Sequence, residues 1–149
     1  MNDEYFMNQA IALAKEAAEE GEVPVGAVVV LDGKIVGAGR NRREISKNAL
    51  AHAEIEAINK ACRALGGWRL WQCDMYVTLE PCPMCTGAII NSRIKRLVYG
   101  ASDYKAGSCG SVIDLFSLPY NHKPEVVSGV MQEECAALLT DFFKKLRKK

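Results

Sequence analysis

The sequence predicts one three-layer α/β/α domain built around a five-stranded mixed sheet, and three observations support this fold class. Helix-like and strand-like patterns alternate along the chain in the order α-β-β-α-β-α-β-α-β-α. Such an order places helices on both faces of a sheet. The length of 149 residues suits one domain with a sizeable core, and no repeat or linker divides the chain. We therefore expect a single domain over residues 1–149.

The first half of the chain predicts a helix, a hairpin and a second helix. Apolar residues recur at helical spacing until Gly21. A long apolar run then predicts a buried strand, and Asp32-Gly33 favours a tight hairpin after it. The elements expected in this half are a helix at Tyr5–Ala18, a strand at Val23–Leu31, a strand at Lys34–Gly39, a polar loop at Arg40–Asn48 and a helix at Ala51–Leu65.

The second half predicts alternating strands and helices. Gly66-Gly67 ends the preceding helix, and Pro81 and Pro83 suit the first turn of a new one. The elements expected here are a strand at Met75–Leu79, a helix from the prolines through Asn91, a strand at Arg96–Gly100, a short helix at Ser111–Leu118, a strand at Val126–Gly129 and a closing helix at Glu133–Arg147.

The charge of the chain is nearly balanced but unevenly distributed. The net charge is +1, which gives no support for non-specific binding to nucleic acid. The first 22 residues carry six carboxylates and one lysine, whereas the last six carry five basic residues. The N-terminus has no basic or apolar signal region, and the longest apolar run is too short to cross a bilayer. We expect a cytoplasmic protein without a membrane segment.

Six cysteines raise the question of disulfides. Four of them stand singly among apolar or small neighbours and are expected to be reduced, mostly core residues. These are Cys62, Cys73, Cys109 and Cys135. Only Cys82 and Cys85 have the spacing of metal ligands.

Two short clusters carry the chemistry: His52-Ala53-Glu54 and Pro81-Cys82-Pro83-Met84-Cys85. Zinc binds imidazole nitrogen and thiolate sulfur, and a catalytic zinc site keeps its fourth position open for water. Glu54 adds a carboxylate that can move protons. A structural zinc site has no use for such a base, whereas a zinc-water catalyst does. The clusters therefore predict a zinc site with His52, Cys82 and Cys85 as ligands and Glu54 as the catalytic base.

The spacing of these residues constrains their geometry. Cys82 and Cys85 are three apart at a predicted helix start, which places both sulfurs on one face and favours their thiolate forms. His52 and Glu54 are two apart and cannot share a helix face. Both reach the metal region only if His52 lies at the irregular entry of its helix. We expect two helix N-termini to converge on one cation, with the thiolate charges offsetting the helix dipoles.

Two other classes of protein fit part of this pattern. A structural zinc or interaction module needs a fourth protein ligand, for which His122, Cys73 and Cys109 are candidates, and it leaves Glu54 without a role. A thiol-disulfide oxidoreductase could use Cys82 and Cys85, but it leaves His52 without a role.

The pair H-x-E and P-C-x-x-C is the signature of zinc deaminases that act on nucleobases. The chain resembles, over nearly its whole length, the bacterial tRNA-specific adenosine deaminases (TadA type) of the cytidine/deoxycytidylate deaminase superfamily. The signature specifies only the superfamily, and the flanking segments specify the subfamily. The resemblance rests on residues 22–28, Asn41, 51–54, 76–85, Ser92-Arg93, Gly100, Ala101, Asp103 and 134–143.

The resemblance implies a cytidine-deaminase-like fold and a complete reaction. His52, Cys82 and Cys85 hold one zinc per subunit, and water is the fourth ligand. Glu54 takes the proton of that water and delivers it to adenine N1. Hydroxide attacks C6, and Glu54 then carries a proton to the departing ammonia. The product is inosine at the wobble position of a tRNA anticodon. The expected partner is the anticodon stem-loop of an arginine-accepting tRNA.

The resemblance also implies substrate-binding residues and a homodimer. Asn41 matches an asparagine that contacts the target nucleoside, although a residue of this type is also common in turns. Asp103 matches a loop position near the tRNA. Phe143 lies beside the basic residues of the C-terminal tail, next to Phe142, and one of these two aromatic residues could instead belong to the core. The candidate phosphate contacts are Arg40, Arg42, Arg43, Lys47, Arg93, Lys105, Lys144, Lys145, Arg147, Lys148 and Lys149.

Three further points belong to this resemblance. The small residues Gly87 and Ala88 allow close packing of the motif helix. Thr86 stands where the family often has alanine, on the helix behind the zinc ligands. A deaminase of free guanine or cytosine would share the fold, the zinc and Glu54, so the choice of adenosine in tRNA depends on Asn41, the tail and the flanking segments.

Overall fold

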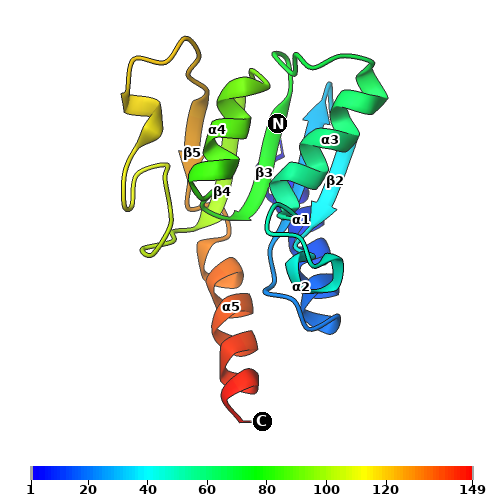
Figure 1. Ribbon diagram of the computed structural model, residues 1–149, viewed down its shortest axis with the longest axis vertical. Coiled ribbons are helices and arrows are strands. Elements are labelled where there is room, and N and C mark those ends of the chain that lie inside the picture. Colours follow the sequence, from blue (N-terminus) through cyan, green and yellow to red (C-terminus); the bar gives the residue numbers. More distant parts are fainter. Residues whose placement is uncertain (1, 149) are drawn as a thin grey trace.

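A five-stranded mixed sheet lies between two layers of helices in the computed structural model, which describes residues 2–148 (Figure 1). The strand order is β2-β1-β3-β4-β5. β1 pairs antiparallel with β2 and with β3, whereas β3, β4 and β5 run parallel. The strands are β1 (Gly26–Leu31), β2 (Lys34–Arg40), β3 (Asp74–Leu79), β4 (Arg96–Ala101) and β5 (Glu125–Ser128). The predicted fold class is confirmed.

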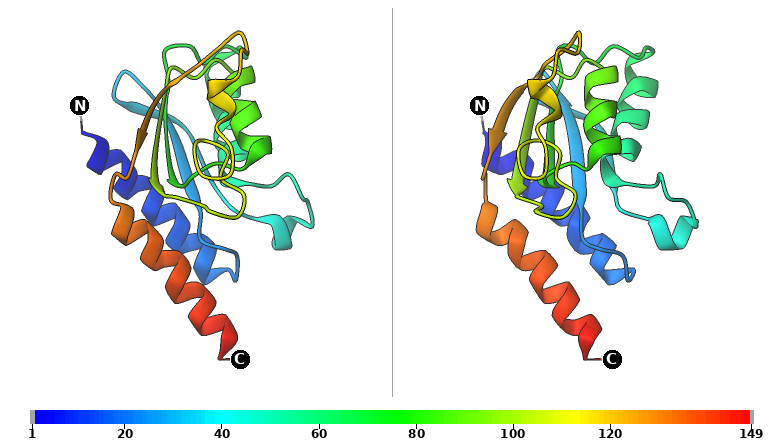
Figure 2. Two further views of the ribbon diagram at one scale, coloured as in Figure 1. Left: turned by 90° about the vertical axis from the view of Figure 1, so that its left-hand side faces the viewer. Right: turned by 60° about the vertical axis from the view of Figure 1, so that its left-hand side comes forward.

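The helices cover the two faces of the sheet in pairs (Figure 2). α1 (Asp3–Glu19) and α5 (Gln132–Arg147) pack on one face, and α3 (Ala53–Leu65) and α4 (Pro83–Asn91) pack on the other. A short helix, α2 (Arg43–Ser46), precedes α3, and a 3-10 turn, η1 (Leu115–Ser117), lies between β4 and β5. Within residues 2–148, no helix has both the length and the apolar character that crossing a membrane requires.

Alternate residues of the central strands build two separate cores. On β1, Val29 belongs to the core under α3 and α4, whereas Val28 belongs to the core under α1 and α5. On β3, Val77 and Tyr76 divide in the same way. Successive side chains of a strand point to opposite faces, so a strand covered on both sides is apolar throughout. This explains why residues 26–30 read as a continuous apolar run and are all buried.

Backbone contact between β2 and α3 fixes the helix over the sheet. A Cβ atom at Gly37 would lie 2.2 Å from the carbonyl oxygen of Ala57, and one at Gly39 would lie 2.4 Å from that of Ala53. Only glycine permits so close an approach. The N-terminal turn of α3 therefore sits directly on the end of β2.

The predicted polar loop at Arg40–Asn48 is wrong in part. β2 continues through Arg40, and residues 43–46 form the helix α2. The backbone N–H groups of Glu44 and Ile45 donate hydrogen bonds to the buried carboxylate of Glu22, at 3.1 and 2.7 Å. The group that satisfies the start of this helix comes from about twenty residues earlier in the chain, so local sequence patterns do not reveal it.

The predicted helix at Ser111–Leu118 is also wrong in most of its length. Only Leu115–Ser117 form a 3-10 turn, and Cys109 and Asp114 make an isolated antiparallel bridge. The backbone N–H of Ser111 donates to the carboxylate of Glu80, so it is bound to a distant segment. The predicted strand at Val23–Leu31 begins only at Gly26. Pro24 has no N–H to contribute to a sheet.

Three of the four isolated cysteines lie in the core, as predicted. Cys73, Cys109 and Cys135 are buried, whereas Cys62 is half-buried. All of them have free thiols.

An ion pair joins the first turn of α1 to the sheet. The guanidinium of Arg96 donates two hydrogen bonds to the carboxylate of Asp3, at 2.9 and 2.6 Å, and the hydroxyl of Tyr76 donates a third at 2.7 Å. The hydrogen bond from Arg96 lowers the pKa of Asp3, with smaller contributions from Tyr76. Since the side chains of Asp3 and Arg96 are only 24% and 16% exposed, solvent screens the pair less than a surface ion pair.

The variant Asp3→Asn tests this contact. We expect it to lower the free energy of unfolding at neutral pH by about 1–3 kcal/mol, because a charged acceptor of three hydrogen bonds is lost. The pKa of Asp3 is lowered in the folded state, so its stabilisation is complete above the unfolded pKa of about 3.9 and is lost as the pH falls through the lower folded value. Urea unfolding of both proteins should therefore differ at neutral pH and converge in strong acid.

Glu4→Gln, an exposed carboxylate in the same first turn, is the matched control and should change stability by less than about 0.5 kcal/mol. A difference between Asp3→Asn and the parent protein that persists unchanged in strong acid would contradict the ion-pair explanation.

Candidate active site

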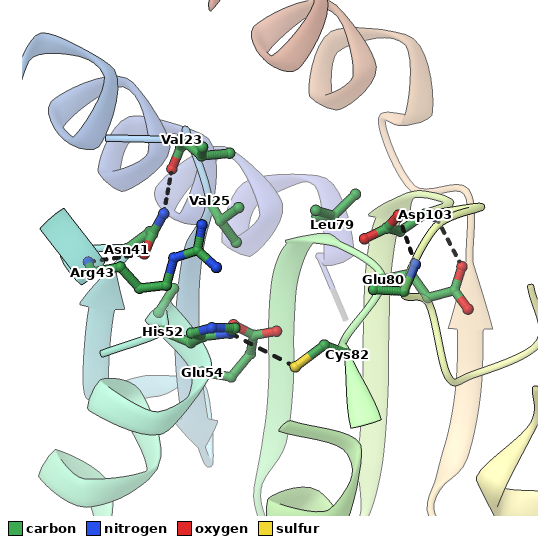
Figure 3. Close-up of a pocket in the computed structure, with 12 residues that line it drawn as sticks. Val23, Val25, Asn41, Arg43, His52, Glu54, Leu79, Glu80, Cys82 and Asp103 are labelled. Carbon is green, nitrogen blue, oxygen red and sulfur yellow. Dashed lines mark hydrogen bonds between the residues drawn. The ribbon is translucent and has the colours of Figure 1, made fainter. Parts of the chain in front are cut away.

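A cavity of about 180 Å³ opens at the edge of the sheet where β3 and β4 end (Figure 3). The carboxyl ends of parallel strands are the usual place for a ligand in an α/β sheet. Its polar lining comes from both motif clusters and from the segments after β2 and β4. The lining residues are Val23, Val25, Asn41, Arg43, His52, Ala53, Glu54, Leu79, Glu80, Cys82, Asp103 and Ala106.

His52 lies at the entry of α3, as the spacing requires. It is the residue before the first helical turn and has an extended backbone, with φ −86° and ψ 153°. Because the chain turns into the helix only after His52, the imidazole and the carboxylate of Glu54 line the same cavity although they are two residues apart. The expected geometry is confirmed.

Cys82 occupies the equivalent position at the start of α4. Its backbone is also extended, Pro83 forms the first helical residue, and Cys85 lies in the first turn. The Nδ1 atom of His52 is 3.7 Å from the sulfur of Cys82 and 3.6 Å from that of Cys85. Two helix N-termini therefore converge on one cluster of three donor atoms, all within 4.8 Å of one another.

The three donor atoms fit a tetrahedral zinc ion. With Zn–S about 2.3 Å and Zn–N about 2.0–2.1 Å, a tetrahedron places nitrogen and sulfur about 3.6 Å apart. Both measured separations agree with this value. In residues 2–148, no further histidine, cysteine or carboxylate joins the group, which leaves one of four positions free of protein.

The candidates for a fourth protein ligand lie elsewhere. The Nε2 atom of His122 is 2.7 Å from the carbonyl oxygen of Ile94. The thiol of Cys109 is 3.4 Å from the hydroxyl of Thr86, which is buried on α4. Cys73 is buried in the core under α3 and α4. A redox pair, in turn, would leave without a role the imidazole of His52, which lies within 3.7 Å of both sulfurs.

Hydrogen bonds link the side chains of His52, Cys82 and Cys85. A hydrogen bond from Cys85 lowers the pKa of Cys82 to about 4, and the same hydrogen bond together with burial raises the pKa of Cys85. A hydrogen bond with Cys82 raises the pKa of His52. A metal ion would displace these protons, because zinc binds thiolate and neutral imidazole.

Glu54 is a buried carboxylate with a raised pKa. Its side chain is only 4% exposed, and burial raises its pKa to about 7. A carboxylate that titrates near neutral pH can both accept and release a proton under physiological conditions. It lies at the cavity beside the three donor atoms (Figure 3).

Asn41 lines the cavity and also shapes a turn. Its Nδ2 donates to the carbonyl of Val23 at 3.1 Å, and its Oδ1 accepts from the N–H of Arg43 at 3.2 Å. The second contact is the local hydrogen bond that asparagine makes in turns. An amide has two donor hydrogens and two acceptor lone pairs, so one of each remains for a ligand. Both interpretations of this residue are therefore compatible with its position.

Asp103 and Phe143 lie in different surroundings. Asp103 lines the cavity, and its carboxylate accepts hydrogen bonds from the N–H groups of Lys105 and Ala106, at 3.0 and 3.2 Å. Phe143 lies on α5, 40% exposed, with its ring against that of Phe142 at 5.4 Å between centroids. The fold brings Asp103, but not Phe143, to the lining of the cavity.

The motifs do not reveal the roles of two buried carboxylates: Glu80 in the cavity lining, and Glu22, which precedes the lining residue Val23. Glu22 binds the first turn of α2, and Glu80 binds backbone N–H groups after β4. Burial alone would raise the pKa of Glu80, but hydrogen bonds from Ser111 and from backbone N–H groups bring it below the ordinary value. Glu80 directly follows the apolar strand β3, and Glu22 directly precedes the apolar run of residues 23–31, a signal that could have marked both as buried.

Comparison with known proteins agrees with the geometry of the site. The family model of the MafB19-like deaminases matches residues 1–147. The tRNA-specific adenosine deaminase of Bacillus subtilis is 51% identical over 148 residues, which cover 99% of this chain and 92% of that protein.

Two solved structures are similar over most of their length. One, from work on A-to-I editing by tRNA:A34 deaminases at the wobble position, has a TM-score of 0.88 and 48% identity, covering 91% of this chain and 99% of the other. The guanine deaminase of Bacillus subtilis has a TM-score of 0.68 and 35% identity, covering 100% and 96%. The chain belongs to the MafB19-like deaminases and, among them, to the tRNA-specific adenosine deaminases.

Proposed function

We propose that this protein converts adenosine to inosine by zinc-dependent hydrolysis at the wobble position of a tRNA anticodon. The observation that carries the proposal is the placement of the buried carboxylate of Glu54 at the same cavity as three donor atoms with zinc spacing. This combination supports hydrolytic deamination, and the sequence similarity to tRNA-specific adenosine deaminases supports the substrate.

His52, Cys82 and Cys85 would hold the zinc ion. Zinc, when bound, acts as a Lewis acid that lowers the pKa of a water molecule toward neutrality. The sulfurs reach the site from the residue before α4 and from its first turn, and the imidazole reaches it from the entry of α3. Because each ligand belongs to a helix start that packs on the sheet, the site is preorganised before the substrate arrives.

Glu54 is the proposed proton carrier. It accepts a proton from the attacking water and passes it to N1 of adenine, which makes C6 more electrophilic. Oxygen then bonds to C6. Glu54 takes the proton of the new C6 hydroxyl and delivers it to the amino group as the C6–N bond breaks, which leaves a carbonyl at C6 and releases ammonia. Adenosine and water thus yield inosine and ammonia. One carboxylate can perform both steps because burial raises the pKa of Glu54 to about 7.

The cavity suits one flat base. Its volume of about 180 Å³ is below the roughly 300–1,000 Å³ of pockets for drug-sized ligands. Val23, Val25 and Leu79 offer apolar surface to the faces of a base, and Asn41 offers an amide to its edge. A base in an anticodon loop can be turned outward without opening a helix. We propose that Asn41 and Asp103 contact the nucleoside.

The closing helix is the proposed contact for the rest of the tRNA. α5 extends away from the sheet at its C-terminal end (Figures 1 and 2). Its last turn carries Lys144, Lys145 and Arg147, and Lys148 follows, whereas Lys149 lies outside the described residues. Basic side chains beside an exposed aromatic ring suit a nucleic-acid backbone with an unpaired base. We therefore propose Phe143 as a stacking residue.

Several other basic residues make contacts within the chain. Arg40 donates to the carboxylate of Glu20 at 2.8 and 3.0 Å, and Arg93 donates to backbone carbonyls at the end of α4. Arg43, in contrast, lines the cavity. Among the predicted phosphate contacts, Arg43 is therefore better placed than Arg40 or Arg93.

A homodimer remains a proposal that the surface of α4 supports. A Cβ atom at Gly87 would meet nothing within 4 Å, so this helix presents an uncovered, closely approachable face. Small residues on such a face allow another chain to pack near the backbone.

The substrate assignment is tested by incubating the purified protein with an arginine-accepting tRNA and with free guanine. We expect inosine at the wobble position of the tRNA and no xanthine from guanine. Glu54→Gln should lower the rate on tRNA by at least about 100-fold, because it keeps the shape of the side chain but removes the proton carrier. Sequencing of the tRNA and chromatography of the bases provide the measurements.

Glu56→Gln is the matched control for this experiment. Glu56 lies on the same helix and forms an ion pair with Lys60, at 3.5 Å. Its side chain is half-buried, also pairs with Arg42 at 3.9 Å and is not part of the cavity lining, so its variant should keep the parent rate within about twofold. Xanthine from guanine without inosine in tRNA would replace the assignment with guanine deamination, the second candidate, which the similarity to guanine deaminase favours. Full activity of Glu54→Gln would refute the mechanism.

Metal analysis tests the ligand set independently of activity. We expect about one zinc per chain in the purified protein and much less in Cys82→Ser, because the site then has only two strong ligands. Removal of zinc by a chelator should abolish activity, and added zinc should restore it. Cys62→Ser, in the half-buried thiol of α3, should keep its zinc. Equal zinc content in both serine variants would disprove the proposed ligands.

Phe143→Ala tests the role of α5. We expect its KM for tRNA to rise about 5- to 100-fold with little change in kcat, since loss of one stacked base costs roughly 1–3 kcal/mol. Leu146→Ala, in an even more exposed apolar side chain of the same helix, should leave KM within about twofold. Equal KM values for Phe143→Ala and the parent protein would remove Phe143 from the proposed substrate contacts.

A further inference from the structure

The segment from Asp103 to Ser111 forms one wall of the cavity without regular structure of its own. It follows β4 and contributes Asp103 and Ala106 to the lining (Figure 3). Apart from Cys109, which bridges to Asp114, none of its residues belongs to a ladder or helix. Its position therefore depends on the contacts that it makes with the neighbouring strand end.

Four of these contacts meet at one buried carboxylate, and a fifth runs from the N–H of Ser108 to the carbonyl oxygen of Pro81. Glu80, only 2% exposed, follows the last residue of β3. Its Oε1 accepts from the N–H of Asp103 and from the hydroxyl of Ser111, and its Oε2 accepts from the N–H groups of Cys109 and Ser111. The three N–H contacts each measure 3.0 Å. A carboxylate has about four acceptor positions, so the segment uses all of them.

The backbone of the segment is shaped around this carboxylate. A Cβ atom at Gly107 would lie 2.4 Å from Cδ and 2.6 Å from Oε1 of Glu80, and 2.4 Å from the carbonyl oxygen of Asp103. Only a residue without a side chain fits there. The close approach at Gly107 is independent of the hydrogen bonds. Both observations identify the carboxylate of Glu80 as the group that anchors the segment.

The anchor holds both ends of the segment. The N–H of Asp103 binds Glu80 at the beginning, and the N–H of Ser111 binds it at the end. The carboxylate of Asp103 is thereby held at the cavity, where it also accepts the N–H groups of Lys105 and Ala106. Movement of the anchor would move Asp103, whereas Glu54 lies on a different element, α3.

We propose that Glu80 is a positioning residue for substrate binding: it fixes the segment 103–111, and through it Asp103, as the wall against which the nucleoside docks. This inference rests on the proposed function. It predicts that replacing Glu80 changes KM through Asp103. Proton transfer by Glu54 and metal binding by Cys82 are separate from this effect.

The isosteric variant Glu80→Gln tests the anchor in the zinc-loaded protein. An amide NH₂ cannot accept from an N–H, so either orientation of the glutamine leaves at least one backbone donor unpaired. We expect hydrogen exchange at the amides of Asp103, Cys109 and Ser111 to accelerate at least about 10-fold, since hydrogen bonds to charged groups are the stronger ones. The amides of α4 should exchange as before, and the zinc content should not change.

Kinetics on an anticodon stem-loop tests the effect on substrate. We expect KM to rise about 10-fold in Glu80→Gln with kcat within about twofold, as for an interaction that contributes equally to the ground state and the transition state. In the background Asp103→Ala, the effect of Glu80→Gln on KM should shrink to less than about twofold, because the residue through which it acts is gone.

Two further variants sharpen this double-mutant cycle. Glu22→Gln is the matched control: this carboxylate is equally buried and accepts two backbone N–H bonds, but it anchors α2. Its effect on KM should be the same with and without Asp103→Ala. Gly107→Ala, which displaces the anchor without changing any charge, should reproduce the pattern of Glu80→Gln. If Glu80→Gln does not fold, Gly107→Ala and Ser111→Ala carry the same test, the latter with a smaller acceleration of exchange.

The outcomes separate this inference from the proposed function. Unchanged exchange at the three amides, loss of zinc in Glu80→Gln, or an effect on KM that persists in full in Asp103→Ala would each overturn it. A parent protein that forms no inosine in tRNA would refute the proposed function. The exchange measurement needs no activity and would then decide alone whether Glu80 anchors the wall.

Discussion

The convergence of two helix starts on one point is the constraint on which the rest of this structure depends. His52 and Cys82 each keep an extended backbone for one residue before the chain becomes helical, and their side chains meet at 3.7 Å. The positive ends of both helix dipoles face the same place, which repels a cation unless thiolates are present. The two cysteines of α4 supply that negative charge, so the ligand types and the arrangement of the helices require each other.

The sheet holds these helix starts in register. β2 touches α3 through the backbone at Gly37 and Gly39, and α4 follows directly from the end of β3. A shift of either helix by a fraction of an ångström would change the spacing of the donor atoms. The continuous apolar strand β1, covered on both faces, lies between these two connections in the sheet. The chemistry of the site therefore depends on ordinary packing in both cores.

The sequence predicted what local patterns encode. Hydrophobic periodicity revealed the strands and helices, and the two-residue separation of His52 and Glu54 foretold the irregular entry of α3. The prediction from periodicity failed at residues 40–48 and 111–118. There, backbone N–H groups bind the buried carboxylates of Glu22 and Glu80, which lie in distant segments of the chain. Such contacts join residues about 20–30 positions apart and leave no periodic trace. The same limit applies to the proposed substrate residues: spacing identified the proposed metal ligands, whereas the positions of Asn41, Asp103 and Phe143 depend on the whole fold.

Buried carboxylates hold the loops of this enzyme by their backbone N–H groups, so the exposed side chains of these loops can be substituted. In the segment 103–111, the fold is carried by backbone N–H groups and a glycine, while the side chains of Tyr104 and Lys105 point to solvent, Tyr104 with 81% exposure. Their identity is nearly independent of the folding of the segment. Substitutions at such positions can change the surface beside the cavity while the proposed metal site stays intact. The exposed surface of the segment and the proposed catalytic residues are thus carried by different parts of the chain, and each can change without the other.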